Sequence, residues 1–522
     1  MACARTEARA HGGTGMPGRT LILAVPLCLC AAMPARAQCP DGTPPPCGAR
    51  AVPSVAPTPN SVAVMYFVTR DTSDAYLADG LTEEITTSLG RLGRLAVVVP
   101  SAVRRAQRVR GDDVRALGRA LNVQWVVDGS IRRSGDHLRV DVRLVDAGRE
   151  TEAWSDAYTR ATTDLFAIEA DIAREVATGI AGTLAPAERT TLARPAPNPV
   201  AHDRVLRGNF YLARRTQADA VRAVAEYEQA TRLDPSYAEA FGRLAVAYVL
   251  IHNWAWQFPG LSRDSVLARA ETDAHRALAL DSSSAVAWLA EGAERMERFA
   301  RTMEGAVPAL GRSVAIDPRQ ADALHLLGVA QVTLGHDSAG ITALMQALAL
   351  DPGRAITLAW MGIESFHLRR YREALRWYDS ALAVAPAFPL ALIRRAAARL
   401  NLGDTAGALD DAREGLGASQ GDTLLALSML AYVEAAAGDS VLAERHLRPV
   451  AEARETLEEG IGRAAAALAV LGKKDAALTL LESAPRDVFL RYYLGDPDLD
   501  PLRTEPRFRR LEAELRTPGT DP

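Results

Sequence analysis

Three acidic side chains near the start of the first structured region are candidates for acid–base chemistry. Asp79 is followed by Glu83 and Glu84, and paired carboxylates can divide the acid and base roles of a proton-transfer reaction. The same pattern suits a helix start, with Asp79 as the N-cap of a helix over Leu81–Leu89 and acidic residues in its first turn. We favour the structural interpretation and expect no catalytic residues here.

A basic cluster lies further along the chain, at Arg104, Arg105, Arg108 and Arg110. Such a cluster can bind phosphate or nucleic acid. No aromatic residues interleave with it, and the formal net charge of −4 creates no overall basic field. We therefore expect a solvated surface patch and no nucleic-acid partner.

The sequence contains none of the common metal, phosphate or nucleophile motifs, such as H-E-x-x-H, G-x-x-x-x-G-K or G-x-S-x-G. The nine histidines are scattered. His325 and His367 fall on helices of the repeats described below, where a surface or groove position is the simpler explanation and a shared ligand role has no support. We expect no metal, no cofactor and no enzymatic activity.

Apolar spacing predicts that residues 61–185 form a small α/β domain in the order β-α-β-α-β-β-α. The expected strands include a hairpin that turns at Ser134-Gly135-Asp136. The predicted strands are Ser61–Val68, Leu95–Val99, Val123–Ile131 and Leu138–Val145, and the predicted helices are Leu81–Leu89, Asp112–Leu121 and Leu165–Leu184.

Residues 201–485 repeat. Pro318, Pro352 and Pro386 are spaced by 34 residues and end apolar helices, which is the pattern of tetratricopeptide repeats. About seven or eight repeats are expected, with small residues such as Gly362 and Ala374 allowing the two helices of a pair to approach closely. Residues 486–522 would hold a capping helix, Asp498–Leu515, and a tail.

The repeats provide the functional inference, because such arrays bind ligands along the face formed by the first helix of each pair. On this alignment that face is largely apolar and lacks a row of Lys and Asn for a terminal carboxylate, so a helix or an extended apolar segment suits it better. Part of the stripe could instead be buried against neighbouring helices or the α/β domain. The candidate partner-binding residues are Val329, Val332, Ile356, Ile363, Phe366, Leu390 and Ile393.

An insertion around residues 252–264 carries Trp254 and Trp256. Aromatic anchors are common in binding hot spots. Packing of the insertion onto the array is the simpler explanation, and we favour it.

The N-terminus has the features of a secretion signal, residues 1–37. An apolar core over Leu21–Ala32 precedes Ala35-Arg36-Ala37, which fits an A-x-A cleavage site. An uncleaved anchor is the minor alternative, because the core is short for a bilayer span. Either Met1 or Met16 could be the start codon. We expect a periplasmic or secreted protein without a transmembrane span in its mature form.

A Pro-rich linker is expected over residues 38–60. It contains Cys39 and Cys47, which either form a small disulfide or remain idle in the linker.

Several stretches of residues 61–185 resemble the module related to the TolB amino-terminal domain that precedes tetratricopeptide repeats in many bacterial proteins. They include Ser61–Val64, Leu77–Ile85, Val127–Arg133 and Leu165–Ile168, and Asp500–Arg503 with Pro506–Phe508 is similar to the usual close of such arrays. In that family the pair often follows an adenylate cyclase, Ser/Thr kinase or winged-helix domain. Here a signal occupies the preceding space, so the resemblance implies a sensory or scaffolding part without its effector.

We therefore predict an α/β small N-terminal domain followed by an all-α tetratricopeptide-repeat solenoid. Its predicted function is to bind a protein or peptide in the cell envelope, with cell-envelope components as one partner class. The alternative is the regulatory half of a signalling system whose cyclase or kinase lies in another chain.

Overall fold

The computed structural model describes residues 57–192, 197–254, 256–298, 303–419, 423–453 and 458–516. The predicted signal peptide, most of the Pro-rich linker and both Cys39 and Cys47 lie outside the described residues.

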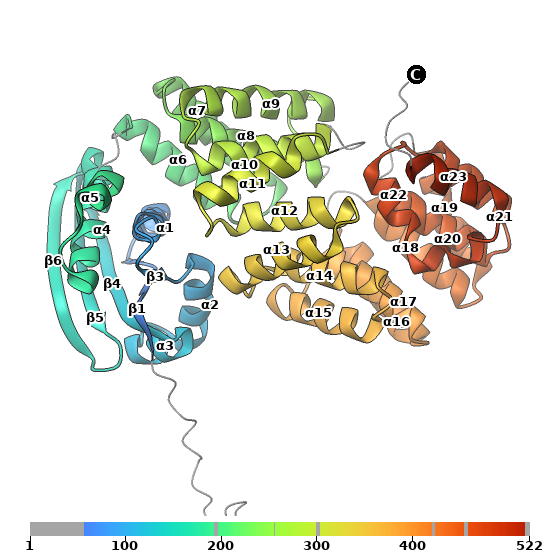
Figure 1. Ribbon diagram of the computed structural model, residues 1–522, viewed down its shortest axis with the longest axis horizontal. Helices are drawn as coiled ribbons and strands as arrows, with labels where there is room; N and C mark the ends of the chain where they lie inside the picture. Colours follow the sequence, from blue (N-terminus) through green and yellow to red (C-terminus); the bar gives the residue numbers. More distant parts are fainter. Residues whose placement is uncertain are drawn as a thin grey trace, which may run out of the picture. The chain divides into compact units, whose positions relative to one another are not determined.

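The N-terminal domain is built on one mixed sheet with the strand order β3-β1-β4-β5-β6 (Figure 1), and β2 pairs with β4. The first strand runs parallel to β3 and β4, whereas β4, β5 and β6 are antiparallel. The strands are β1 (Thr58–Val64), β2 (Val68–Thr69), β3 (Ala96–Val97), β4 (Val123–Ser134), β5 (His137–Asp146) and β6 (Thr151–Ala161).

Helices cover both faces of this sheet, which is why β1 is apolar on both sides. Val62 and Val64 pack in one cluster with α1 (Ala75–Gly90) and α4 (Leu165–Ala181). Ala63 and Met65 pack in a second cluster with residues of α2 (Pro100–Arg110) and α3 (Val114–Leu121). A strand buried on both faces needs a continuous apolar run, and Ser61–Val68 supplies one.

The single strand predicted over Ser61–Val68 ends at Val64, and β2 is a separate short strand. Strand β6 and helix α2 were not predicted, and both have weak apolar patterns. Strand β6 is largely exposed, and α2 buries only Ala102 and Val103. Strand β1 also begins at Thr58, inside the range expected for the linker. The predicted hairpin turn between β4 and β5 is present.

Pairs of antiparallel helices follow, and within the described residues there are eight of them. We call the first member of each pair, from α6 to α20 in even numbers, the first helices. The pairs are α6 (Pro199–Leu212) with α7 (Gln217–Leu233), α8 (Ala238–Asn253) with α9 (Arg263–Leu280), α10 (Ala285–Arg298) with α11 (Ala306–Ile316), α12 (Ala321–Thr333) with α13 (Asp337–Leu350), α14 (Ala355–His367) with α15 (Tyr371–Val384), α16 (Pro389–Asn401) with α17 (Thr405–Ala418), α18 (Thr423–Ala436) with α19 (Ser440–Glu452), and α20 (Glu458–Val470) with α21 (Lys474–Ser483). A short helix, α5 (Pro186–Leu192), precedes them.

Small residues at fixed positions let the two helices of a pair come close, as predicted. A Cβ atom on Gly362 would lie 2.4 Å from the ring of Tyr378, and one on Gly208 would lie 2.3 Å from the ring of Tyr227. Both tyrosines and Ala374 are fully buried. The glycine in the first helix therefore makes room for the aromatic ring of the second.

The chain ends differently from the expected single capping helix over Asp498–Leu515. Helix α22 (Val488–Leu494) is followed by the 3₁₀ segment η3 (Pro497–Leu502), and only Pro506–Arg516 forms an α-helix, α23. Prolines explain the break, since each lacks the N–H group that a helix interior requires. We call residues 487–503 the C-terminal segment.

The aromatic insertion packs onto the array. Trp256 is buried, Trp254 is partly buried, and their ring centroids are 5.3 Å apart. Trp254 also lies 6.4 Å from the ring of Phe388, which precedes α16. These contacts agree with the packing interpretation.

The predicted fold class is confirmed: a small α/β domain is followed by a solenoid of helix pairs. Among the described helices, none has both the length and the apolar character needed to span a bilayer.

Candidate functional site

The C-terminal segment lies against first helices of the second half of the array. Its aspartates, at alternate positions 496, 498 and 500, contact side chains from α14, α16, α18 and α20, or from the turn after α14. Four repeats thus present polar groups to one short acidic stretch of the same chain.

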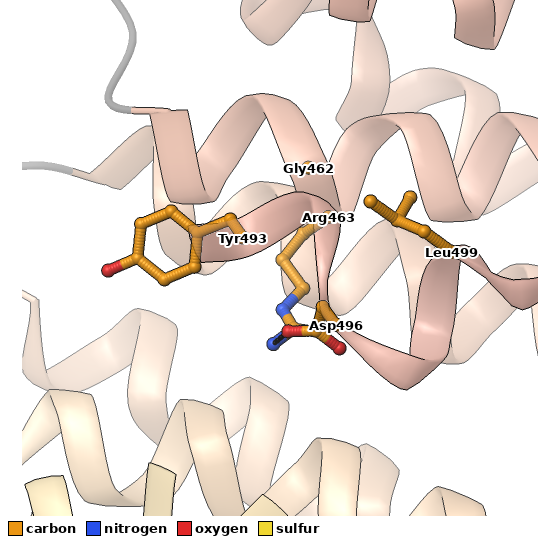
Figure 2. Close-up of a pocket in the computed structure, with 5 residues that line it drawn as sticks. All are labelled: Gly462, Arg463, Tyr493, Asp496 and Leu499. Atoms are coloured by element: carbon orange, nitrogen blue, oxygen red, sulfur yellow. Dashed lines mark hydrogen bonds and ion pairs between the residues drawn. The ribbon is translucent and has the colours of Figure 1, made fainter. Parts of the chain in front are cut away.

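Arg463 of α20 is central to this arrangement. One of its Nη atoms donates to Asp496 at 3.1 Å and also contacts Asp498, and its second Nη donates to Asp496 at 2.5 Å. Figure 2 shows the guanidinium facing the Asp496 carboxylate in a small pocket that Gly462, Tyr493 and Leu499 complete. Arg463 and both aspartates are at most 3% exposed.

Each aspartate has further partners on other first helices. Arg394 of α16, the largest fully buried side chain, donates to Asp496 at 3.4 Å, and the His367 ring of α14 lies 3.5 Å from the same carboxylate. Asp498 accepts from the Asn401 amide at 2.8 Å and from the Tyr432 hydroxyl at 3.0 Å. These five side chains contact the carboxylates of Asp496 and Asp498, and we call them the carboxylate row: Arg394, Arg463, His367, Asn401 and Tyr432.

The two buried carboxylates differ in their pKa. Burial raises the pKa of Asp498 to about 6, although Arg463 opposes the rise. Burial acts in the same direction on Asp496, but Arg463, His367 and Arg394 outweigh it and hold the pKa of Asp496 well below its usual range. Burial also lowers the pKa of His367. Asp496 therefore stays charged to a lower pH than Asp498 does.

Apolar contacts accompany the ionic ones. Leu490, Leu494, Leu499 and Leu502 of the C-terminal segment are at most 2% exposed and pack in the same cluster as first-helix residues. Tyr492 stacks near His367, with ring centroids 4.2 Å apart. The site therefore binds a short chain segment through both leucine packing and recognition of two carboxylates.

The structure places most of the predicted partner-binding residues inside the solenoid. Val329, Val332, Ile363, Phe366 and Ile393 are buried, at no more than 4% exposure. Only Ile356 and Leu390 are partly exposed. A partner meeting the folded array could reach these two residues without rearrangement, and the other five support helix packing.

The acidic residues of the N-terminal domain have structural partners. Asp79 is not an N-cap, since α1 begins at Ala75 and includes it. Its carboxylate pairs with Arg104 at 2.9 Å, and Glu83 lies 3.9 Å from the same guanidinium. Burial, with the nearby Glu239 and Glu169 carboxylates, raises the pKa of Glu84 to about 7.

Two arginines of the basic cluster contact other parts of the protein, and the other two are exposed. Arg104 lies over the ring of Tyr66, 3.7 Å from its centroid, and Arg105 pairs with Asp351 at 3.3 Å. Arg108 and Arg110 are exposed. Half of the cluster is therefore engaged in contacts within the protein, and only the other half forms the expected solvated surface.

His325 and His367, the two histidines singled out from the sequence, do not face a common site. His325 is buried and its ring lies 3.1 Å from the Thr357 hydroxyl, whereas His367 faces Asp496. Burial and the neighbouring Arg354 lower the pKa of His325 to about 3, so it is neutral at physiological pH. Across the described residues, no group of three or more His, Cys, Asp or Glu side chains is arranged to hold a metal ion.

The carboxylate row was not predicted from the sequence. The first-helix face was expected to be apolar and to lack groups that bind a carboxylate, but Arg394, Asn401 and Arg463 supply them. The available signal was the placement of Arg394 and Arg463 within otherwise apolar, alanine-rich stretches of first helices. An arginine at such a position requires a buried anion.

The helix pairs match a known repeat. Residues 321–354, which form α12 and α13, match the family model "Tetratricopeptide repeat". The chain therefore carries tetratricopeptide repeats, a fold whose extended faces generally mediate protein–protein interaction.

Particular proteins resemble parts of the chain. A Rhizobium meliloti (strain 1021) protein named "Putative adenylate cyclase 3" is 26% identical over 250 residues, which are 45% of this chain and 42% of that protein. The chain thus spans less than half of that relative's length. Similar solved structures include PilW, a type IV pilus biogenesis factor, at 18% identity, with a TM-score of 0.35, covering 42% of this chain and 96% of that one. Another is a tetratricopeptide repeat protein from Parabacteroides merdae ATCC 43184, at 14% identity, with a TM-score of 0.36, covering 51% and 97%.

Proposed function

We propose that this protein is an exported, non-enzymatic scaffold that binds a protein or peptide partner through the first helices of its repeats. The observation that carries the proposal is that these helices already receive a short acidic segment of the chain through a row of polar side chains. A surface that binds one peptide segment in this way has the chemistry to bind another.

The proposed location is the periplasm, with a TolB-like module at residues 61–185 ahead of the repeats. Support comes from the apolar core and A-x-A site in residues 1–37. N-terminal sequencing of the protein from the periplasmic fraction of its own cells is expected to begin at Gln38. A chain that begins at Met1 or Met16 and stays in the cytoplasm would contradict this location.

The binding role is tested by a crosslinking pull-down of the tagged protein from its own cell envelope. The test variant carries Ile356→Glu and Leu390→Glu, because these predicted partner-binding residues are partly exposed. The control variant is Val441→Glu, which changes a side chain that is 70% exposed on α19, a second helix. We expect the partner to be captured by the wild type and the control but lost from the folded test variant. Equal capture by all three would place the binding surface elsewhere.

A second candidate function is the regulatory half of a signalling system whose adenylate cyclase or Ser/Thr kinase lies in another chain. The observation in its favour is the similarity to part of the protein named as an adenylate cyclase. This function predicts a cyclase or kinase among the captured proteins, encoded beside this gene. Capture of envelope proteins with no such enzyme would favour the scaffold.

A further inference from the structure

The C-terminal segment lies between two folded elements that anchor both of its ends. Before it, α21 completes the last helix pair. After it, α23 is fixed by the fully buried Phe508 and by an ion pair from Arg507 to Glu482 at 2.7 Å. Between these anchors the segment consists of a seven-residue helix and a 3₁₀ turn, and neither forms a helix pair of the repeat type.

We infer that the C-terminal segment is an internal ligand of α14–α20, and that the carboxylate row recognises a partner segment carrying aspartates two residues apart next to leucines. The inference rests on the proposed function and names the chemistry of its partner. The partner displaces the chain's own segment, so the protein binds it only when that segment moves away.

The carboxylate row is the first reason for this inference. Buried ion pairs are a poor way to hold two elements together, because apolar residues of similar volume stabilise as well or better. They do impose selectivity, since an uncharged segment would leave Arg394 and Arg463 without the carboxylate that each now contacts. The row therefore distinguishes acidic segments from neutral ones.

The spacing of the partners is the second reason. Asp496 and Asp498 each contact at least two first helices, while Asp500 forms a bidentate pair with Arg369 at 2.7 and 2.8 Å. Three carboxylates at alternate positions are thus contacted by side chains from four repeats. Bidentate arginine pairs also fix the orientation of the bound segment.

The tether explains why the wild type would bind such a partner weakly. A short segment anchored at both ends has an effective concentration on the order of millimolar at its own site. An external segment of equal affinity competes only at similar concentrations. Weakening the internal ligand should therefore reveal the site.

The test uses the full chain and a labelled synthetic peptide with the sequence of residues 487–503. The variant Asp496→Asn with Asp498→Asn removes the internal charges but keeps the side-chain shapes. We expect this variant to bind the peptide at least about 30-fold more tightly than the wild type does, measured by fluorescence anisotropy. A peptide with asparagine at both positions is the matched control and should lose the gain, as should adding Arg463→Gln to the variant.

Two results overturn the inference. One is a folded double variant that binds the peptide no better than the wild type, which would make the segment a permanent cap. The other is equal binding of the acidic and the asparagine peptides, which would mean that the carboxylate row does not distinguish a charged peptide from a neutral one.

A second measurement covers the case in which the double variant does not fold. Amide hydrogen exchange of the wild type reports local opening. Residues 487–503 are expected to exchange at least about tenfold faster than α20, because the segment leaves while the helix pairs stay folded. Equal protection of the segment and of α20 overturns the inference.

This experiment separates the inference from the proposed function. Capture of a partner that Ile356→Glu with Leu390→Glu abolishes, together with no peptide binding, would support the scaffold and reject the internal ligand. Peptide binding without any captured partner would support the internal ligand and reject the scaffold.

Discussion

Helices α10 and α20, from the two halves of the array, differ in where their buried charges find partners. In α10, Glu291 pairs with Arg295 at 2.6 Å, four residues along the same helix. In α20, Arg463 pairs with Asp496, 33 residues later, and Arg394 of α16 reaches the same aspartate over 102 residues. Helix α10 pairs its buried Glu291 within the same helix, while α20 depends on a distant segment.

This difference separates what stabilises a repeat from what fixes the C-terminal segment. A pair four residues apart forms as soon as the helix forms, and it contributes a few tenths of a kcal/mol. A pair that joins distant segments requires a large loop to close, and removing one partner leaves the other charge buried. Substitution of Arg463 should therefore be more costly than substitution of Arg295.

The largest expected effect is that of Arg463→Met. The change leaves Asp496 and Asp498 buried without the guanidinium that both contact, and such a loss costs about 3–5 kcal/mol. The measurement is the free energy of unfolding in a denaturant titration.

Arg369→Gln is the matched control for that change. Its pair with Asp500 belongs to the same segment, but the two side chains are 51% and 41% exposed, so its loss should cost less than about 1 kcal/mol. Similar losses for Arg463→Met and Arg369→Gln would show that burial does not decide the strength of these contacts.

The next effect concerns pH and Glu364, a buried first-helix residue that accepts from the Tyr492 hydroxyl at 3.2 Å. Burial, with the charge of Asp337, raises the pKa of Glu364 to about 7. Because the raised pKa belongs to the folded state, this carboxyl supports folding at low pH and loses that contribution as pH rises towards 7.

Glu364→Gln should therefore stabilise the protein on the order of 1–3 kcal/mol at pH 8 and have little effect at pH 5. The glutamine carbonyl can still accept from Tyr492. The check is thermal or denaturant unfolding of both proteins at the two pH values. An equal difference at pH 5 and pH 8 would rule out titration of Glu364 as the cause.

Substitution of glycines at the contact between paired helices tests whether the two halves of the array are packed alike inside. A Cβ atom would clash with the ring of Tyr227 at Gly208 and with the ring of Tyr378 at Gly362. Such overpacking costs about 1–3 kcal/mol and the better helix propensity of alanine returns about 1. We expect each Gly→Ala change to lower the free energy of unfolding by about 1–2 kcal/mol.

Gly417→Ala in α17 is the control, because nothing lies within 4 Å of the added atom, and it should be neutral or mildly stabilising. A clear difference between Gly208→Ala and Gly362→Ala would mean that the interiors of the halves differ as well as their faces.

The interior of the repeats could be predicted because it depends on local spacing. Gly362, Ala374 and Tyr378 recur at positions that a period of 34 residues defines, and the structure buries the last two completely. The same periodicity assigned Ile363 and Phe366 to an open face, but it cannot tell which side of a first helix a neighbouring repeat covers. Those residues are buried, because adjacent first helices pack against each other.

The carboxylate row could not be predicted from spacing. Nothing in the local pattern of Arg463 indicates that residues 496 and 498 reach it, since the intervening α21 and α22 interrupt any period. The prediction that Asp79 is a helix N-cap was wrong for a related reason. Its sequence suits a helix cap, yet α1 begins four residues earlier at Ala75, and the Arg104 guanidinium accounts for the acidic residue instead.

The smallest expected effect returns to the local pair in α10. Arg295→Gln removes the partner of Glu291, but the His275 ring lies 3.5 Å from that carboxylate and can still contact it. Because Arg295 is about one-third exposed, water can also compensate, and the cost should be about 0.3–0.5 kcal/mol. The cost should fall further in 1 M salt, which screens partly exposed charges but reaches buried ones poorly. Denaturant titrations of Arg295→Gln and Arg463→Met at low and high salt would measure both points. If the two substitutions respond equally to salt, the distinction between local and distant pairs fails, and the internal ligand loses its main energetic argument.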